Sequence, residues 1–346
     1  MLFSNISTNA SSYTNTSAGF LLFIGGIDLL WLSTLIISGL FGSIFVLAVL
    51  YYSRRLKNVL GYQIGLIKTL DILIISTVLV PANFATFQKS YNFIPEVCVF
   101  SATMLIYFQG QLTMVYTLIA VDRFLTIFLP FSYAGKLNVK VWMAVTAVMS
   151  LFCLLATLFF VYHDSTYISF QSYSFICYVN TDVTGFLNMS FLVMYTVPTG
   201  IIIISYTAII CKVIRERISI RRQSPAAVQE TNGKHGWFHE LIGHLRATKM
   251  LFFITLCFLL SFVPSLVVDN LIKNNLVEDV GNQLLLLKFS SYIIFTYTVV
   301  NSFIFYGTSK IFKEETNEML SRFTRLKRRS RRSTSLFGTS TFTTRV

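Results

Sequence analysis

The amino-acid sequence indicates an all-α protein, a bundle of seven membrane-spanning helices followed by a short amphipathic eighth helix. Three observations carry this prediction. Of the 346 residues, 54% are hydrophobic and only 12% are charged, whereas soluble domains devote about a quarter of their residues to charges. Apolar stretches of spanning length recur along the chain, and basic residues gather in alternate loops. The net charge of +13 is therefore read as a signal of membrane orientation rather than of nucleic-acid binding.

Seven stretches reach the roughly 20 apolar residues that a helix needs to cross the hydrocarbon core. They lie at about 29–52, 60–85, 95–128, 138–162, 187–214, 246–272 and 284–307. The second and seventh are the least apolar, because Lys68 and Asp71 interrupt one and Asn301 interrupts the other. The predicted parts are an N-terminal segment 1–27, a bundle 28–308, an amphipathic helix 309–324 and a basic Ser/Thr-rich tail 325–346.

Charge asymmetry predicts how the bundle sits in the membrane. Most Lys and Arg residues follow the first, third, fifth and seventh spans, most densely between Arg322 and Arg332, while the opposite loops hold few. By the positive-inside rule, the N-terminus is extracellular and the C-terminus cytoplasmic. We expect a multi-pass protein of the plasma membrane.

Three sequons in the N-terminal segment agree with this orientation. They begin at Asn5, Asn9 and Asn15, and such sequons mark exposed segments on the secreted side. We expect glycans at these positions.

Two of the five cysteines lie on the same, oxidising side. Cys98 opens the third span and Cys177 lies in the loop after the fourth, so a bridge between them would pin that loop over the bundle. The other three, within apolar spans, are expected to be packing residues.

The third span closes on an acid and an arginine. Asp122 and Arg123 end a stretch long enough to cross a bilayer, and Phe124, Pro130 and Phe131 follow them. Charges there are costly unless they face protein or water. We therefore treat the pair as a functional hypothesis rather than a surface accident.

Seven spans, an external N-terminus, the two outer cysteines and this spaced motif together resemble a rhodopsin-like (class A) G-protein-coupled receptor, with Phe124 in place of the family's Tyr. The resemblance covers about residues 31–312 and identifies no subfamily. It implies that Asp122 holds Arg123 in the inactive state. In the active state, Arg123 would turn toward Tyr206 and a heterotrimeric G protein. The implied coupling residues are Asp122, Arg123, Phe124, Pro130, Phe131 and Tyr206.

The resemblance also implies an activation switch. Its residues here are Asp71, Phe258, Phe262, Pro264, Asn301 and Phe305. Pro264 removes a backbone donor and kinks the sixth helix, which makes that helix the expected moving element. Many relatives lock the sixth helix with an acid; the position here is His244, which predicts raised ligand-independent signalling.

Asp71 is a mid-membrane carboxylate, which is expensive unless it is paired. Relatives use this Asp and a polar shell to hold a sodium ion, and Ser43 and Leu112 thin that shell here, so we expect little sodium modulation. Lys68, one turn earlier, is either the partner of Asp71 or a side chain that snorkels inward. We favour snorkelling.

The ligand is constrained mainly by what is missing. Amine receptors carry an Asp where this chain has Leu105, and opsins carry the retinal lysine where it has Phe295, which argues against a biogenic amine and against light reception. The predicted pocket residues are Leu105, Gln109, Ser190, Met194, Asp269 and Ser291. A mostly apolar set with a few polar groups is typical of ligand sites. Asp269 either pairs with a ligand cation or is a solvated acid at a helix end.

The loop after the fourth span favours one ligand class. Residues 166–179 are rich in β-branched and aromatic types, which suits a β-hairpin, a feature common in peptide receptors of the family. We favour a peptide ligand over a lipid or odorant-like molecule.

Beyond the seventh span, Lys310, Phe312 and Lys313 suit an amphipathic helix on the inner leaflet. The basic cluster 325–332 either binds anionic membrane lipid or acts only as a stop-transfer signal during membrane insertion. Phosphorylation of the Ser and Thr residues in the tail would recruit arrestin in this family. The terminal residues Thr344 to Val346 fit a PDZ ligand.

A transporter or channel is the main alternative class, and only Lys68 and Asp71 point to it. A membrane enzyme would need clustered ligands or a nucleophile with its base. His235 and His239 lie in a loop without carboxylate or thiol partners, which does not favour a zinc site. We expect a receptor that is not an enzyme and uses no metal and no cofactor.

Overall fold

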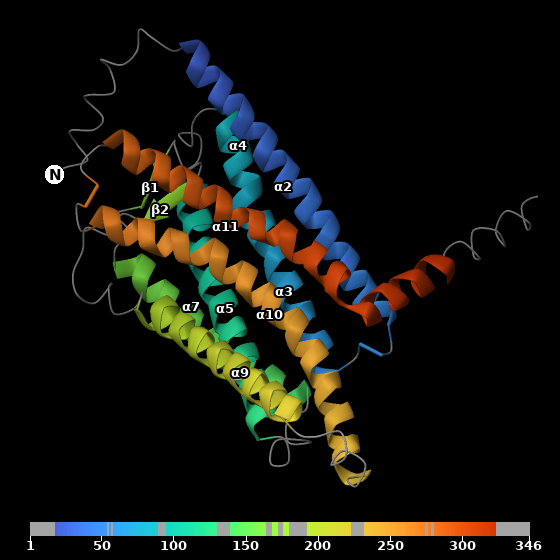
Figure 1. The fold of residues 1–346 in the computed structure, drawn as a ribbon. Coiled ribbons are helices and arrows are strands. Elements are labelled where there is room, and N and C mark those ends of the chain that lie inside the picture. Colours follow the sequence, from blue (N-terminus) through green and yellow to red (C-terminus); the bar gives the residue numbers. More distant parts are fainter. Residues whose placement is uncertain are drawn as a thin grey trace, which may run out of the picture.

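The computed structural model describes residues 18–53, 55–56, 58–88, 95–129, 139–163, 168–171, 176–179, 192–222, 232–273, 276–277 and 280–322. Within these ranges, long helices pack side by side as one bundle, with a small β-hairpin near one end (Figure 1). The predicted all-α bundle is confirmed.

In the described part of the chain, seven helices are long and apolar enough to cross a membrane. The first four spans are Gly26–Tyr52 in α2 (Ala18–Tyr52), Val59–Phe87 across α3 (Val59–Ile74), η2 (Ile75–Leu79) and α4 (Val80–Gln88), Glu96–Phe128 in α5 (Pro95–Phe128), and Val139–Phe159 in α7 (Val139–His163). The last three are Val193–Arg215 across η4 (Leu192–Thr196) and α9 (Val197–Arg222), Lys249–Val268 in α10 (Asn232–Lys273), and Leu285–Thr308 in α11 (Val280–Thr308). All seven coincide with predicted stretches. At its N-terminal end α2 begins before the predicted boundary at 27, because the apolar run already starts there.

Two spans contain a π-helical turn, and each turn lies just before a proline. Leu79 ends η2 and Pro81 follows in α4, while Thr196 ends η4 and Pro198 follows in α9. Proline has no N–H, and its ring clashes with the carbonyl one turn back. A widened turn relieves that clash, and such π-bulges are one recognised source of helix bending. Pro264 lies inside α10.

The helix α5 forms the centre of the bundle. Of its most apolar window, 61% is buried, against 22% for α7. The outer surface carries large apolar side chains, among them Phe41, Leu260 and Phe303. A contiguous apolar surface of this size suits hydrocarbon rather than water.

After α11 the chain turns into a helix over residues 310–322, which runs away from the bundle at the lower right of Figure 1. Phe312, Thr316 and Met319 are buried at helical spacing while Lys310 is exposed. The exposed Arg55 lies 3.5 Å from Glu315 and ties the helix to the segment after α2. This is the predicted amphipathic eighth helix.

The predicted hairpin is also present. Strands β1 (Ile168–Gln171) and β2 (Ile176–Val179) pair antiparallel, with Phe170 opposite Cys177. The pairing satisfies the backbone of a segment whose β-branched and aromatic residues favour extended structure.

Candidate functional site

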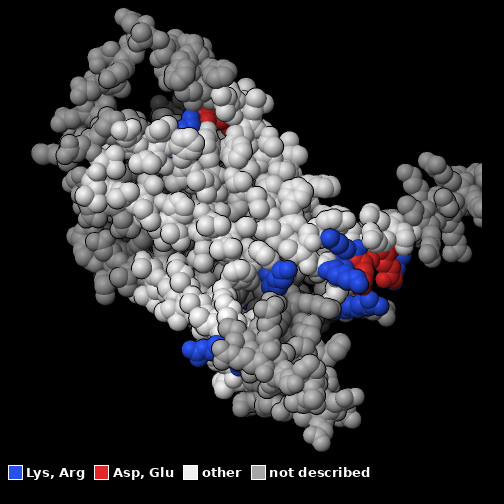
Figure 2. Space-filling view, viewed as in Figure 1, with Lys and Arg blue, Asp and Glu red and all other residues white. Residues whose placement is uncertain are grey.

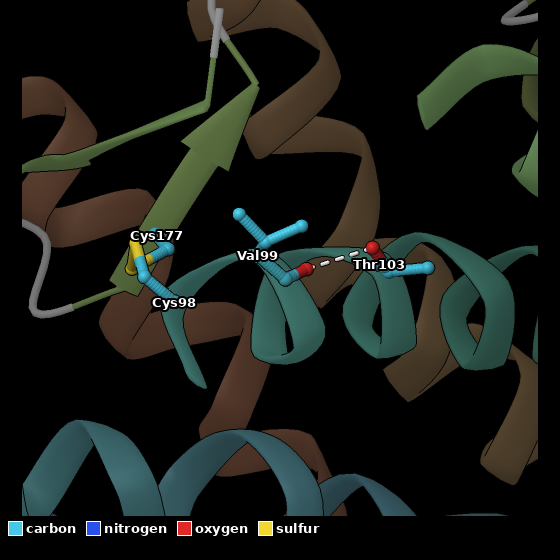
Figure 3. Close-up of a disulfide and its surroundings, with 4 residues drawn as sticks. All are labelled: Cys98, Val99, Thr103 and Cys177. Atoms are coloured by element: carbon cyan, nitrogen blue, oxygen red, sulfur yellow. Dashed lines mark hydrogen bonds between the residues drawn. A yellow bond between two sulfur atoms is a disulfide. The ribbon is translucent and has the colours of Figure 1, made fainter. Parts of the chain in front are cut away.

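The disulfide fixes one end of the bundle. Cys98 at the start of α5 is bonded to Cys177 of β2, with Cα atoms 5.4 Å apart. Figure 3 shows the strand held against the first turn of α5, next to the hydrogen bond that Thr103 donates to the Val99 carbonyl. Ala85 and Ala102 pack around the bridge. The predicted pairing is confirmed, and it places the hairpin over this end.

The Asp122 and Arg123 motif lies at the opposite end of α5. Arg123 Nη2 is 2.6 Å from Asp122 Oδ2, and the two residues are 8% and 5% exposed. Gln63 of α3 donates from Nε2 to the same carboxylate oxygen at 3.5 Å. A short charge-assisted pair of this kind is strong. The arrangement is the one expected of the inactive state, with the arginine held by its neighbour.

Tyr206 of α9, the expected active-state partner of Arg123, is engaged elsewhere. Its buried hydroxyl lies 3.2 Å from Thr255 Oγ1 of α10, and its ring packs edge-on against Phe252. This bond ties α9 to α10.

The last turn of α5 is capped from α9 by a residue that the sequence did not single out. Lys212 donates from Nζ to the Ile127 carbonyl at 2.7 Å and lies 4.7 Å from the centroid of the Phe128 ring. Phe124 stacks on Phe128 at 4.4 Å. A cation at a helix C-terminus meets carbonyls that have no intrahelical partner. Pro130 and Phe131 lie outside the described residues.

The expectation that Lys68 snorkels is wrong. Its side chain is fully buried, and Nζ lies 2.8 Å from Asp71 Oδ2 and 3.0 Å from Ser302 Oγ of α11. The three-residue spacing puts Lys68 and Asp71 on one face of α3. That face turns into the bundle, so the ammonium finds two oxygen acceptors there and has no need to reach water.

Lys68, Asp71 and Ser302 form a polar core inside the bundle, and two tyrosines that sequence analysis missed extend it. Tyr297 of α11 donates to Asp71 Oδ1 at 3.2 Å, and its hydroxyl lies 3.3 Å from that of Tyr116 on α5. Asn301 donates from Nδ2 to the Tyr116 hydroxyl at 3.4 Å. Tyr297 stands four residues before Asn301, one turn along the same face. That spacing is the signal that could have found it.

Aromatic rings continue from this core toward the end with the disulfide. Phe258 of α10 stacks on Tyr116 at 4.5 Å and on Phe262 at 5.4 Å. Phe262 in turn contacts Tyr195 of η4 at 5.6 Å. Phe258, Phe262 and Phe305 are all buried. Of the predicted switch residues, Phe258 and Phe262 lie in this series of contacting rings, which we call the aromatic column (Tyr195, Phe262, Phe258, Tyr116 and Tyr297).

The predicted pocket residues are only partly assembled. Leu105 is half-buried, and Gln109 is buried, with no hydrogen-bond partner for its Nε2 among the residues that the structure describes. Met194 lies so close to α5 that a Cβ on Gly110 would be 2.6 Å from its Cε. Ser291 donates to the Leu287 carbonyl of its own helix at 2.9 Å. Ser190 and the side chain of Asp269 lie outside the described residues, as do the sequons at Asn5, Asn9 and Asn15.

A further ion pair, which the sequence analysis missed, joins the first and last spans. Lys288 of α11 lies 2.9 Å from Asp28 of α2, which is 2% exposed and also accepts a hydrogen bond from Tyr292. In Figure 2 the described surface between its upper edge and its lower part is almost uncharged, and acidic and basic side chains crowd the helix over residues 310–322. The uncharged band is what a bilayer-spanning surface requires.

Comparison with known protein families adds the final observation. Residues 42–305 match the 7 transmembrane receptor (rhodopsin family), a range that holds the disulfide, the Asp122 and Arg123 motif and the polar core. A search of the curated proteins found no match to this chain. The match covers most of the chain and agrees with the seven spans, so the chain belongs to the rhodopsin family of seven-transmembrane receptors.

Proposed function

We propose that this receptor binds an extracellular ligand at the end bearing the disulfide and activates heterotrimeric G proteins at the end bearing Arg123. The observation that supports this most directly is the pair at the end of α5. Arg123 is 2.6 Å from Asp122 and is supported through that acid by Gln63 of α3. Among the described residues, this nearly buried guanidinium pairs with its sequence neighbour, and a pair of this kind can exchange partners.

The exchange has a structural route. A ligand that displaces Tyr195 or Phe262 pushes on the aromatic column, because each ring in it contacts the next. Movement of α10 breaks the bond between Tyr206 and Thr255 and frees the phenol for Arg123. Packed cores switch between discrete arrangements rather than deforming smoothly. The inner end of α10 would then open a docking site for the G protein.

Orientation follows from charge and from the disulfide. A disulfide forms on the oxidising side of a membrane, and basic loops remain in the cytoplasm. We therefore place the hairpin outside and the helix over residues 310–322 at the inner leaflet of the plasma membrane, with N-linked glycans on the outer N-terminal segment.

The ligand we favour is a peptide. A two-stranded hairpin pinned by Cys177 lies at the outer end, and strand edges can bind an extended peptide through backbone hydrogen bonds. For the tail we propose arrestin recruitment after phosphorylation and a PDZ partner at Thr344 to Val346. The tail beyond 322 lies outside the described residues.

The test is ligand-independent second-messenger output in cells expressing Arg123→Ala. The matched control is Arg322→Ala, an arginine paired with Glu318 at the same 2.6 Å but on an exposed helix surface. With equal surface expression, Arg123→Ala should abolish output above that of untransfected cells and Arg322→Ala should retain it. Full output from Arg123→Ala, across a panel of G proteins, would refute the proposal.

A further inference from the structure

Asp71 is a fully buried carboxylate in a spanning helix, and its charge must be balanced. Burying an ionised carboxylate without a partner is prohibitive, so such groups pair, bind a cation or become neutral. Here the balancing charge belongs to the chain. Lys68 Nζ lies 2.8 Å from Asp71 Oδ2, and both side chains have no exposed surface.

The ammonium occupies a site built largely of oxygen atoms from two helices. Besides Asp71 of α3, it meets Ser302 Oγ of α11 at 3.0 Å, and it lies 5.3 Å from the centroid of the Phe305 ring. The Tyr297 hydroxyl bonds the other oxygen of the carboxylate. Oxygen donors around a carboxylate are the ligands that small hard cations prefer.

Two further observations indicate that the site would persist without the ammonium. Ser302 is held in place by α2, because a Cβ on Gly42 would lie 2.9 Å from both its Cβ and its Oγ. Asn301, the neighbour of Ser302, is buried, and among the described residues its Oδ1 has no hydrogen-bond partner. The oxygen atoms are therefore positioned by packing rather than by Lys68 alone.

We propose that Lys68 is a tethered internal cation, which fills a monovalent-cation site at Asp71 and makes the receptor independent of soluble sodium. The side chain reaches the site from one turn earlier on the same helix, so its effective concentration there is far above that of any free ion. Shortening Lys68 to Ala removes the charge and opens room for an ion. Lys68→Met removes the charge but fills the room.

The test is the thermal unfolding midpoint of the purified full-length receptor in detergent, measured in sodium chloride and in N-methyl-D-glucamine chloride at equal ionic strength. An ion that binds only the folded state raises the unfolding midpoint, and this rise saturates as the ion concentration increases. The wild type should show equal midpoints in the two salts. Lys68→Ala should gain a saturable sodium-dependent rise, whereas Lys68→Met and the double variant Lys68→Ala with Asp71→Asn should not.

Two results would overturn the proposal. One is a sodium-dependent rise in the wild type. The other is a folded Lys68→Ala variant that responds to sodium no more than Lys68→Met does. If folded Lys68→Ala can be purified in sodium chloride but not in N-methyl-D-glucamine chloride, the proposal is supported, since the sodium ion then replaces the ammonium. If Lys68→Ala cannot be purified in folded form in either salt while Lys68→Met can, the result counts against the proposal.

Discussion

Neutralising Lys68 and Asp71 one at a time should destabilise the receptor more than neutralising both. Lys68→Met leaves the Asp71 carboxylate buried without its cation, and Asp71→Asn leaves the ammonium buried without its anion. Removing one partner of a buried pair costs about 3–5 kcal/mol, whereas replacing both is often nearly neutral. The 2.8 Å distance and the complete burial of both side chains put this pair in that class.

The assay is again the thermal unfolding midpoint of the purified full-length receptor in detergent. Each single variant should lower the midpoint by roughly 5–10 °C, and the double variant should lie above both. The matched control is the exposed pair Arg322 and Glu318, at 2.6 Å, for which a double-mutant cycle should give only about 0.3–0.5 kcal/mol. Additive losses for Lys68 and Asp71 would refute our reading of the polar core.

Three more predictions concern the packing and the lock. Phe258→Ala should destabilise the receptor by about 3–5 kcal/mol, because the ring is 1% exposed and stacks on two neighbours. The control Phe303→Ala removes a ring that is 70% exposed and should change the unfolding midpoint little. Equal losses in the two variants would contradict the proposed core. Replacing both Cys98 and Cys177 by Ser should lower the free energy of unfolding by about 2–5 kcal/mol, measured as a lower midpoint in a size-exclusion thermostability assay. The control Cys211→Ser, which replaces an exposed free cysteine, should leave the midpoint unchanged. His244→Glu should lower ligand-independent second-messenger output by restoring the acidic lock, and unchanged output at equal surface expression would show that no such lock operates.

The spans and the hairpin could be predicted because their signals are local. A helix that crosses a bilayer must carry about 20 apolar residues in a row, and β-branched and aromatic residues beside Cys177 favour strands. The disulfide required only that two cysteines lie on the same side. The motif at Asp122 and Arg123 was visible because charge at the end of an apolar run is rare.

The partners across helices could not be predicted in this way. Lys68 lies 234 positions from Ser302, and no local pattern shows that the two helix faces meet. The snorkelling expectation failed because Asp71 on α3 and Ser302 on α11 together hold the ammonium inside the bundle, and only the Asp71 contact could be weighed from α3 itself. The ion pair of Asp28 and Lys288 was not predicted either, because the two residues are 260 positions apart in the sequence. Tyr116 gives no local signal either, because its role depends on the Tyr297 hydroxyl of α11, 3.3 Å from its own.

The most direct test of the central claim, that Arg123 is the G-protein contact held in check by Asp122, is guanine-nucleotide exchange on a purified heterotrimeric G protein. The receptor alone supplies the stimulus, so no ligand is needed. Because Asp122→Asn weakens the 2.6 Å pair and frees the guanidinium, exchange should be fastest with Asp122→Asn, slower with the wild type and absent with Arg123→Ala. Equal rates for the three receptors, or a slower rate with Asp122→Asn than with the wild type, would contradict the account.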